Sequence, residues 1–182
     1  EYEYGSDGDD GYNYGSDQGG EDAPEDDARV AIENAYYEGD DFRQDQPKKA
    51  LELFEKVVQL ETELGDEVKW RFKALGQMVA LHFRLRNHEA MLRRYREMLA
   101  FVGSVTRNEC TDAVNGILDT LATSTDLPIV GQMYEMTLGA LKDSSNERMW
   151  FNTNVKLARV YMQIGDAAAA DKVINELHRS CQ

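Results

Sequence analysis

The sequence predicts an all-α protein, an open right-handed solenoid of about four helical hairpins preceded by an acidic tail. Three observations predict this fold. From residue 28 onward, apolar residues recur at helical spacing almost throughout. Only three prolines occur, and Pro47 and Pro128 stand where helices should start, a position that needs no backbone N–H. Turn residues recur at about twice a forty-residue period, and Trp70 and Trp150 lie 80 residues apart, which indicates a repeat.

The N-terminal tail carries most of the negative charge. Residues 1–28 hold eleven of the 34 carboxylates and none of the 20 basic residues, in a chain whose net charge is −14. The tail is also rich in Gly and Asp and has almost no aliphatic side chains to bury, so we expect residues 1–27 to be disordered. Residues 28–182 then suffice for one helical-repeat domain.

Periodicity and turn residues divide that domain into eight expected helices. They lie near residues 28–39, 47–64, 67–85, 88–104, 109–123, 127–142, 146–164 and 167–180. Short turns join them, so neighbours should form antiparallel hairpins. The last hairpin follows the tetratricopeptide pattern most clearly, with Ala158 and Ala170 at close helix crossings and Gly165-Asp166 at the turn. These features favour a tetratricopeptide-like α-solenoid, and a closed helix bundle is the alternative.

Positive charge is concentrated in residues 69–107, which hold nine basic residues and two carboxylates. A local charge of +7 in an acidic chain indicates a docking surface rather than a catalytic pocket. Within helix 67–85, one strip between two apolar flanks is expected to be exposed and contains Lys69, Lys73, Gly76, Ala80 and Arg84. The basic surface that we predict to bind a polyanion or an acidic protein face comprises Lys69, Arg71, Lys73, Arg84, Arg86, Arg93, Arg96 and Arg107.

Two other interpretations of this charge remain open. In the first, the region is only a solvated face, where Arg93 pairs with Glu89 and Glu97 on its own helix for a few tenths of a kcal/mol each. In the second, the chain is a nucleic-acid-binding repeat module. The second is disfavoured because the strip has no exposed aromatic residue for base stacking and Tyr95 should face the core.

Motifs for catalysis or metal binding do not occur in the sequence. The three histidines do not form H-E-x-x-H, and no nucleophile or phosphate-loop motif is found, so we expect no enzymatic activity. Cys110 and Cys181 have no C-x-x-C partner, which fits a reducing compartment and predicts no metal. No apolar run approaches the ~18–20 residues of a membrane span, so a soluble, intracellular protein without a membrane partner is expected.

Several local motifs resemble one family. They are Glu33-Asn34-x-Tyr36-Tyr37, Trp70-x-Phe72-Lys73-Ala74-Leu75-x-Gln77-Met78, Thr106-Arg107-Asn108, Ile117-Leu118-Asp119, Thr137-Leu138-x-Ala140-Leu141-Lys142-Asp143, Trp150-Phe151-x-Thr153-Asn154 and Leu177-His178-x-Ser180-Cys181-Gln182. Together with the acidic, tyrosine-dotted tail, they resemble the N-terminal helical-repeat region of the second-subunit family of the COP-9 signalosome. A proteasome lid subunit of the same broad superfamily is the nearest rival.

The resemblance implies a non-catalytic scaffold that docks cullin–RING ubiquitin ligases, while a separate metalloprotease subunit removes the modifier Nedd from the cullin. It further implies other signalosome subunits as partners, inositol hexakisphosphate as a bridging anion, and a location in the cytoplasm and nucleus. Lys73 and Arg84 stand where the family has exposed lysines, whereas Gly76 and Ala80 replace two others. Because the family continues into a C-terminal PCI domain with a winged helix, which is absent here, we expect a piece of a longer polypeptide.

Overall fold

The computed structural model describes residues 24–65, 67–142 and 146–180, and this part of the chain contains eight α-helices and no β-strand. The helices are α1 (Pro24–Phe42), α2 (Pro47–Leu64), α3 (Lys69–Arg84), α4 (His88–Leu99), α5 (Arg107–Leu121), α6 (Leu127–Leu141), α7 (Glu147–Ile164) and α8 (Ala167–Ser180). Residues 1–23 lie outside the described part, so the disorder of the tail stays a prediction.

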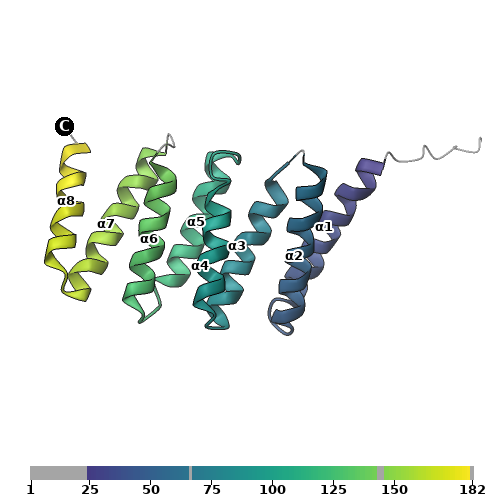
Figure 1. The fold of residues 1–182 in the computed structure, drawn as a ribbon, viewed down its shortest axis with the longest axis horizontal. Helices are drawn as coiled ribbons and strands as arrows, with labels where there is room; N and C mark the ends of the chain where they lie inside the picture. The colour runs from purple at the N-terminus through teal and green to yellow at the C-terminus, as the bar shows by residue number, and fades with distance from the viewer. Residues whose placement is uncertain (1–23, 66, 143–145, 181–182) are drawn as a thin grey trace, which may run out of the picture.

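The helices form an elongated double layer (Figure 1). The even-numbered helices stand side by side in one row, and the odd-numbered helices slant behind them. Most consecutive helices pack against each other, α3 also packs on α1 and α5, and α4 packs on α6. α1 and α8 lie at opposite ends of the array (Figure 1). This open arrangement confirms the predicted α-solenoid and contradicts a closed bundle.

One consequence of the hairpin topology is that all odd-numbered helices run in the same direction. Their N-terminal ends therefore lie along one edge of the array, and α1 begins at that same edge (Figure 1). Because the start of a helix carries partial positive charge and unpaired N–H groups, this edge suits acidic groups.

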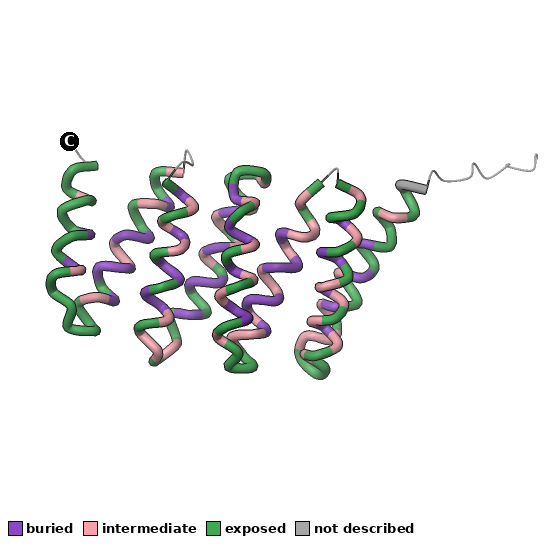
Figure 2. The backbone as a smooth tube through the Cα atoms, viewed as in Figure 1, coloured by how far each residue is buried: buried purple, intermediate pink, exposed green. Residues whose placement is uncertain are grey.

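The hydrophobic core lies between the two rows and runs the length of the array (Figure 2). Tyr95 of α4 is fully buried, as the sequence predicts. Its hydroxyl lies 2.6 Å from Oγ1 of Thr137 on α6, and that hydroxyl donates its own proton to the carbonyl of Met133 at 2.7 Å. Tyr95 must therefore be the donor to Thr137. This bond satisfies both hydroxyls and links two neighbouring hairpins inside the core.

Most helix boundaries fall within three residues of the prediction, and three of the differences have a clear physical reason. α1 begins at Pro24, four residues earlier than expected, so residues 24–27 belong to the helical domain and not to the tail. Asp26 and Asp27 lie in its first turn, where the helix dipole favours negative charge. α4 ends at Leu99 instead of residue 104. After Leu99, the backbone N–H groups donate mainly to carbonyls three residues earlier instead of four, which makes turns in place of an α-helix. Val102 is still buried there, which explains why the apolar pattern predicted a longer helix.

The third difference is at the start of α5, which begins at Arg107 rather than residue 109. Thr106 forms a capping box with Glu109. The Thr106 hydroxyl accepts from the Glu109 N–H at 3.3 Å, and the Glu109 carboxylate accepts from the Thr106 N–H at 3.2 Å. The motif Thr-x-x-Glu is readable in the sequence, and it fixes the start of the helix two residues before the apolar pattern does.

Candidate partner-binding surface

The first turn of α3, where the basic region begins, is held by a buried carboxylate from α2. Glu61 is 1% exposed and accepts hydrogen bonds from the backbone N–H groups of Trp70 at 2.9 Å and Arg71 at 2.6 Å. The start of a helix leaves these donors unpaired, and Val68, which precedes the helix, cannot cap them. Glu61 thus replaces a local cap and places negative charge at the positive end of the helix dipole.

Arg71 is tied to this carboxylate. Its Nε lies 3.8 Å from Glu61 Oε2, and its terminal nitrogens donate to Thr62 Oγ1 and to the carbonyl of Glu67, both at 3.2 Å. The guanidinium also packs on the ring of Phe101, 4.6 Å from its centroid. Because the Arg71 side chain is only 14% exposed and its charge is paired, it belongs to the fold and not to the exposed basic surface.

Lys69 and Lys73, which we call the lysine pair, lie beside an aromatic cluster. Their Nζ atoms are 5.4 and 4.8 Å from the centroid of the Trp70 ring, within cation–π range. Trp70 in turn contacts Tyr36 and Tyr37 of α1, with ring centroids 5.0 and 5.7 Å apart. Tyr37 is 55% exposed. The lysine pair therefore borders an accessible aromatic surface that sequence periodicity did not reveal.

The lysine pair also meets carboxylates from the next repeat. With Glu109 and Asp112 of α5, the two lysines line a hollow of about 260 Å³. Hydrogen bonds from Thr106, reinforced by the charges of Lys73 and Lys69, hold the pKa of Glu109 below its ordinary value. The sequence showed no carboxylate at helical spacing because this one comes from a different helix. The local charge at this end of α3 is thus lower than the sequence count suggests.

The middle of the strip on α3 is not an exposed surface. Gly76 and Ala80 are half-buried. A Cβ on Gly76 would lie 3.7 Å from Met98 Sδ and 3.9 Å from Ile117 Cδ1, so this position faces α4 and α5 at ordinary contact distances. Small residues here belong to the packing between helices, and they interrupt the strip between Lys73 and Arg84.

Arg84 and Arg86 lie at the other end of α3, about 16 Å along the helix axis from Lys73. A terminal nitrogen of Arg84 donates to the carbonyl of Arg43 at 3.0 Å. Arg86 stands in the turn before α4 with a left-handed φ of +56°. Together with residues 123–126 of the turn between α5 and α6, they line an open hollow of about 790 Å³. These two arginines form a second basic group, separate from the lysine pair.

Arg93 and Arg96 are exposed on α4 and form a third group. Among the described residues, no carboxylate lies within 4.0 Å of either one. Glu97 pairs with Arg94 at 2.9 Å, and Arg94 also pairs with Glu55 of α2. The expected pairing of Arg93 with Glu97 is therefore not formed, and the half-buried Arg94 takes that role instead.

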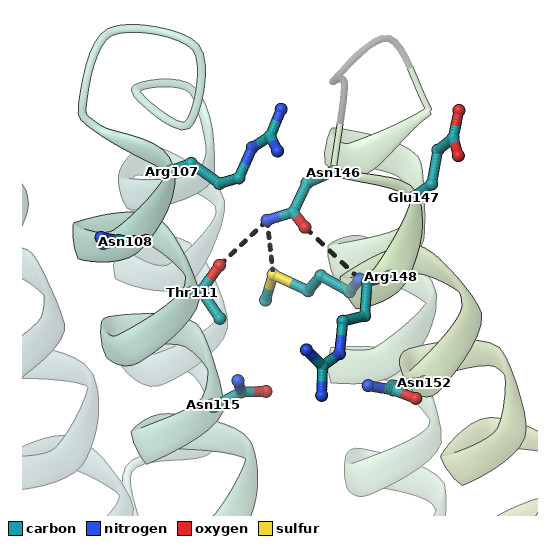
Figure 3. Close-up of a pocket in the computed structure, with 9 residues that line it drawn as sticks. Arg107, Asn108, Thr111, Asn115, Asn146, Glu147, Arg148 and Asn152 are labelled. Atoms are coloured by element: carbon teal, nitrogen blue, oxygen red, sulfur yellow. Dashed lines mark hydrogen bonds between the residues drawn. The ribbon is translucent and has the colours of Figure 1, made fainter.

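Arg107, the eighth predicted residue, lies on the opposite flank of α5 from the lysine pair. It borders a polar cleft of about 610 Å³ between α5 and the start of α7 (Figure 3). We call this the carboxamide cleft, because its lining includes Arg107, Asn108, Thr111, Asn115, Asn146, Arg148 and Asn152. Sequence reasoning missed all of these except Arg107. The available signal was the spacing of seven between Asn108 and Asn115, which places two carboxamides on one face of a helix.

The structure gives no sign of a reactive centre among the described residues. No group of three or more His, Cys, Asp or Glu side chains there could hold a metal ion. Burial, together with the charges of Arg94 and Arg93, lowers the pKa of His82, so this half-buried ring is neutral at physiological pH. Cys110 is buried, and burial raises the pKa of its thiol. No helix in the described part is long and apolar enough to cross a membrane.

The relatives found by comparison with known proteins all bear the same name. The chain is 42% identical over 154 residues to COP9 signalosome complex subunit 2 of Drosophila melanogaster, covering 84% of this chain and 34% of the relative. The subunits of the same name from Caenorhabditis elegans and Emericella nidulans are 39% and 36% identical, over 94% and 89% of this chain and 33% of each relative. This chain is homologous to subunit 2 of the COP9 signalosome. It spans about a third of the length of these relatives.

Solved structures support the fold alone. The crystal structure of BtubC (BKLC) from P. vanneervenii superposes with a TM-score of 0.53 at 17% identity, covering 84% of this chain and 63% of that one. No protein-family profile matches the chain. The homology to subunit 2 thus rests on sequence identity, and the solenoid architecture on both sequence and structure.

Proposed function

We propose that this chain is part of a non-catalytic signalosome subunit that docks cullin–RING ubiquitin ligases for removal of Nedd from the cullin. The observation that carries the proposal is that relatives from three distant species, aligned over 84–94% of the chain, all bear the name of signalosome subunit 2. These relatives favour a signalosome subunit over the rival interpretation as a proteasome lid subunit. In this proposal the subunit works in the cytoplasm and nucleus, and other signalosome subunits bind parts of it beyond this chain.

Three basic groups support docking by charge, and all of their side chains are exposed except that of Lys73, which is half-buried. They are the lysine pair, Arg84 with Arg86, and Arg93 with Arg96, and each comes from the α3–α4 hairpin. Exposed charges act over about a Debye length, ~8 Å at physiological salt, so they accelerate association with an acidic face and make binding depend on salt. The aromatic surface of Trp70 and Tyr37 beside the lysine pair adds apolar contact area, which is typical of interface centres.

The distances between these basic groups limit how inositol hexakisphosphate can bind to this surface. The lysine pair and Arg84 lie at opposite ends of α3, the half-buried Gly76 and Ala80 separate them, and Glu109 and Asp112 share the hollow of the lysine pair. The described residues therefore provide two or three cations at any one point and no enclosing site for six phosphates. An inositol phosphate fits this surface as a bridge whose remaining cations come from the partner.

The test is a titration against a cullin–RING C-terminal fragment across a salt series. The variant Lys73→Glu/Arg84→Glu/Arg93→Glu should lower the affinity at least tenfold, about 1.4 kcal/mol or more, without changing thermal unfolding, because these side chains lie outside the core. The matched control, Lys56→Glu/Lys172→Glu/Arg179→Glu, changes net charge equally at exposed positions away from residues 69–107. Equal affinities of the two variants, or no salt dependence, would reduce the basic surface to a solvated face.

Repeating the titration with inositol hexakisphosphate tests the bridge. The anion should tighten binding of the original chain and of the control variant, and it should have little effect on the basic-surface variant. An equal gain for all three chains would place the anion site on the partner alone.

A further inference from the structure

The carboxamide cleft is built from residues of two different hairpins. Asn115 of α5 and Asn152 of α7 face each other across it, and Arg148 extends between them (Figure 3). Asn146 caps α7 by accepting from the Met149 N–H at 3.4 Å, and its amide donates to Thr111 Oγ1 at 2.9 Å. This last bond ties α7 to α5, so the two walls of the cleft are held in a fixed relation.

The polar groups inside the cleft have unused hydrogen-bonding capacity. In the described part of the chain, the side chains of Asn115 and Asn152 have no hydrogen-bond partner, and Arg148 forms no ion pair. A carboxamide offers two donors and one acceptor oxygen, the same groups as a peptide backbone. Two carboxamides that face each other across a cleft can therefore hold an extended peptide by its main chain, as a neighbouring strand would.

The charge of the cleft selects for an acidic peptide. Arg107 and Arg148 lie at its mouth and centre (Figure 3). Among the described residues that line the cleft, Glu147 is the acidic one, and its carboxylate points away from the opening (Figure 3). The cleft also opens at the N-terminal ends of α5 and α7, whose dipoles add positive potential. The ligand that fits is thus an extended peptide with carboxylates and small side chains.

We propose that the acidic N-terminal segment of this same chain, residues 1–23, binds in the carboxamide cleft. That segment holds eight carboxylates and no Lys or Arg, which complements the charge of Arg148. Six of its residues are glycine, so its peptide groups are open to the carboxamides of Asn115 and Asn152. The segment precedes α1 in the sequence, and the N-terminal end of α1 lies on the same edge of the array as the N-terminal ends of α5 and α7 (Figure 1), whose residues line the cleft.

The tether makes this intramolecular contact feasible. The cleft lies between the second and third odd-numbered helices after α1, roughly 25 Å away at about 10 Å per packed helix. A fully extended chain of 23 residues reaches about 75 Å, and a flexible Gly-rich one averages about 27 Å end to end. About ten residues cross the gap, and the remainder lies in the cleft. A short flexible tether gives an effective concentration in the millimolar range, so a weak contact suffices.

The experiment is paramagnetic relaxation enhancement in the 182-residue chain. A nitroxide is attached at Ser6→Cys in a Cys181→Ser background, and the side-chain amide signals of Asn115 and Asn152 are recorded before and after the label is reduced. We expect both signals to lose most of their intensity at about 20 mM salt and to recover at about 0.5 M, where charges are screened over ~3–5 Å. Unbroadened signals at low salt would overturn the proposal.

Two variants and one mixing control make the result specific. Arg148→Glu and Asn152→Ala should each restore the remaining cleft signals, whereas the exposed Lys172→Glu on α8 should not. Broadening could instead persist in both cleft variants, or the variant Lys69→Glu/Lys73→Glu could remove it. Either result would show that the tail binds at the α3 surface and not in the cleft. In the mixing control, one chain carries the nitroxide but no isotope label, and the other carries the isotope label but no nitroxide. The signals of the isotope-labelled chain should then show no broadening. Broadening in that mixture would identify the occupant as the tail of a second copy, contrary to the proposal.

This inference is independent of the cullin–RING proposal. The docking titration uses charge reversals on α3 and α4, and the relaxation experiment reads residues of α5 and α7. Either can fail while the other succeeds.

Discussion

The two ends of α3 carry similar charges in the sequence and use them in opposite ways. At the first turn, the half-buried Arg71 pairs with the buried Glu61, and the two hold the helix to α2. At the last turn, Arg84 and Arg86 are exposed, and their contacts involve only the backbone. The difference shows that the count of +7 over residues 69–107 combines charges that stabilise the fold with charges that are open to a partner.

Removing the buried carboxylate should have the largest effect on stability. Glu61→Ala leaves two helix N–H groups and the charge of Arg71 without their partner, so we expect a loss of about 3 kcal/mol in the free energy of unfolding. Urea denaturation followed by circular dichroism measures it. The control Glu63→Ala changes an exposed residue of the same helix and should cost less than about 0.5 kcal/mol. Similar losses for the two variants would contradict a structural role of Glu61.

Arg71→Ala should lower the free energy of unfolding by about 2 kcal/mol. In this variant Glu61 keeps its two backbone donors but loses the nearby cation, and the ring of Phe101 loses the guanidinium that packs on it. The matched change at the exposed group is Arg93→Ala, with an expected cost within about 0.5 kcal/mol. Binding to the cullin–RING fragment should show the reverse order, with Arg93→Ala affected more. If Arg71→Ala weakened binding without loss of stability, the division between buried and exposed charges would not hold.

Arg86→Gly should be neutral or stabilising, by up to about 1 kcal/mol, since a left-handed φ of +56° is strained for any residue with a Cβ. The comparison is Arg84→Gly, inside the right-handed last turn of α3, which should destabilise by about 1 kcal/mol. Thermal unfolding of both variants shows whether each substitution raises or lowers the stability. A destabilising Arg86→Gly would show that the Arg86 side chain, and not only its backbone, supports the turn.

Helical periodicity predicted the solenoid well because each helix buries one continuous face, and the eight predicted helices correspond one to one with those observed in the described residues. The candidate site was harder to predict. The role of Arg71 depends on Glu61, ten residues earlier on another helix, and the lysine pair shares its hollow with Glu109 on α5. Spacing within one helix cannot show such pairs. The same limit hid the carboxamide cleft, whose two walls lie about forty residues apart in the sequence.

Trp70 has a spectroscopic consequence. Its indole packs against the tilted ring of Tyr36 and lies within cation–π range of two ammonium groups. The chain has only one other tryptophan, Trp150 on α7. An indole next to positive charge changes its emission when that charge is neutralised or moved. With Trp150→Phe, the chain therefore carries a single tryptophan, which lies beside the lysine pair. Its emission, excited selectively over that of the tyrosines, reports occupancy of this end of α3 without any attached label.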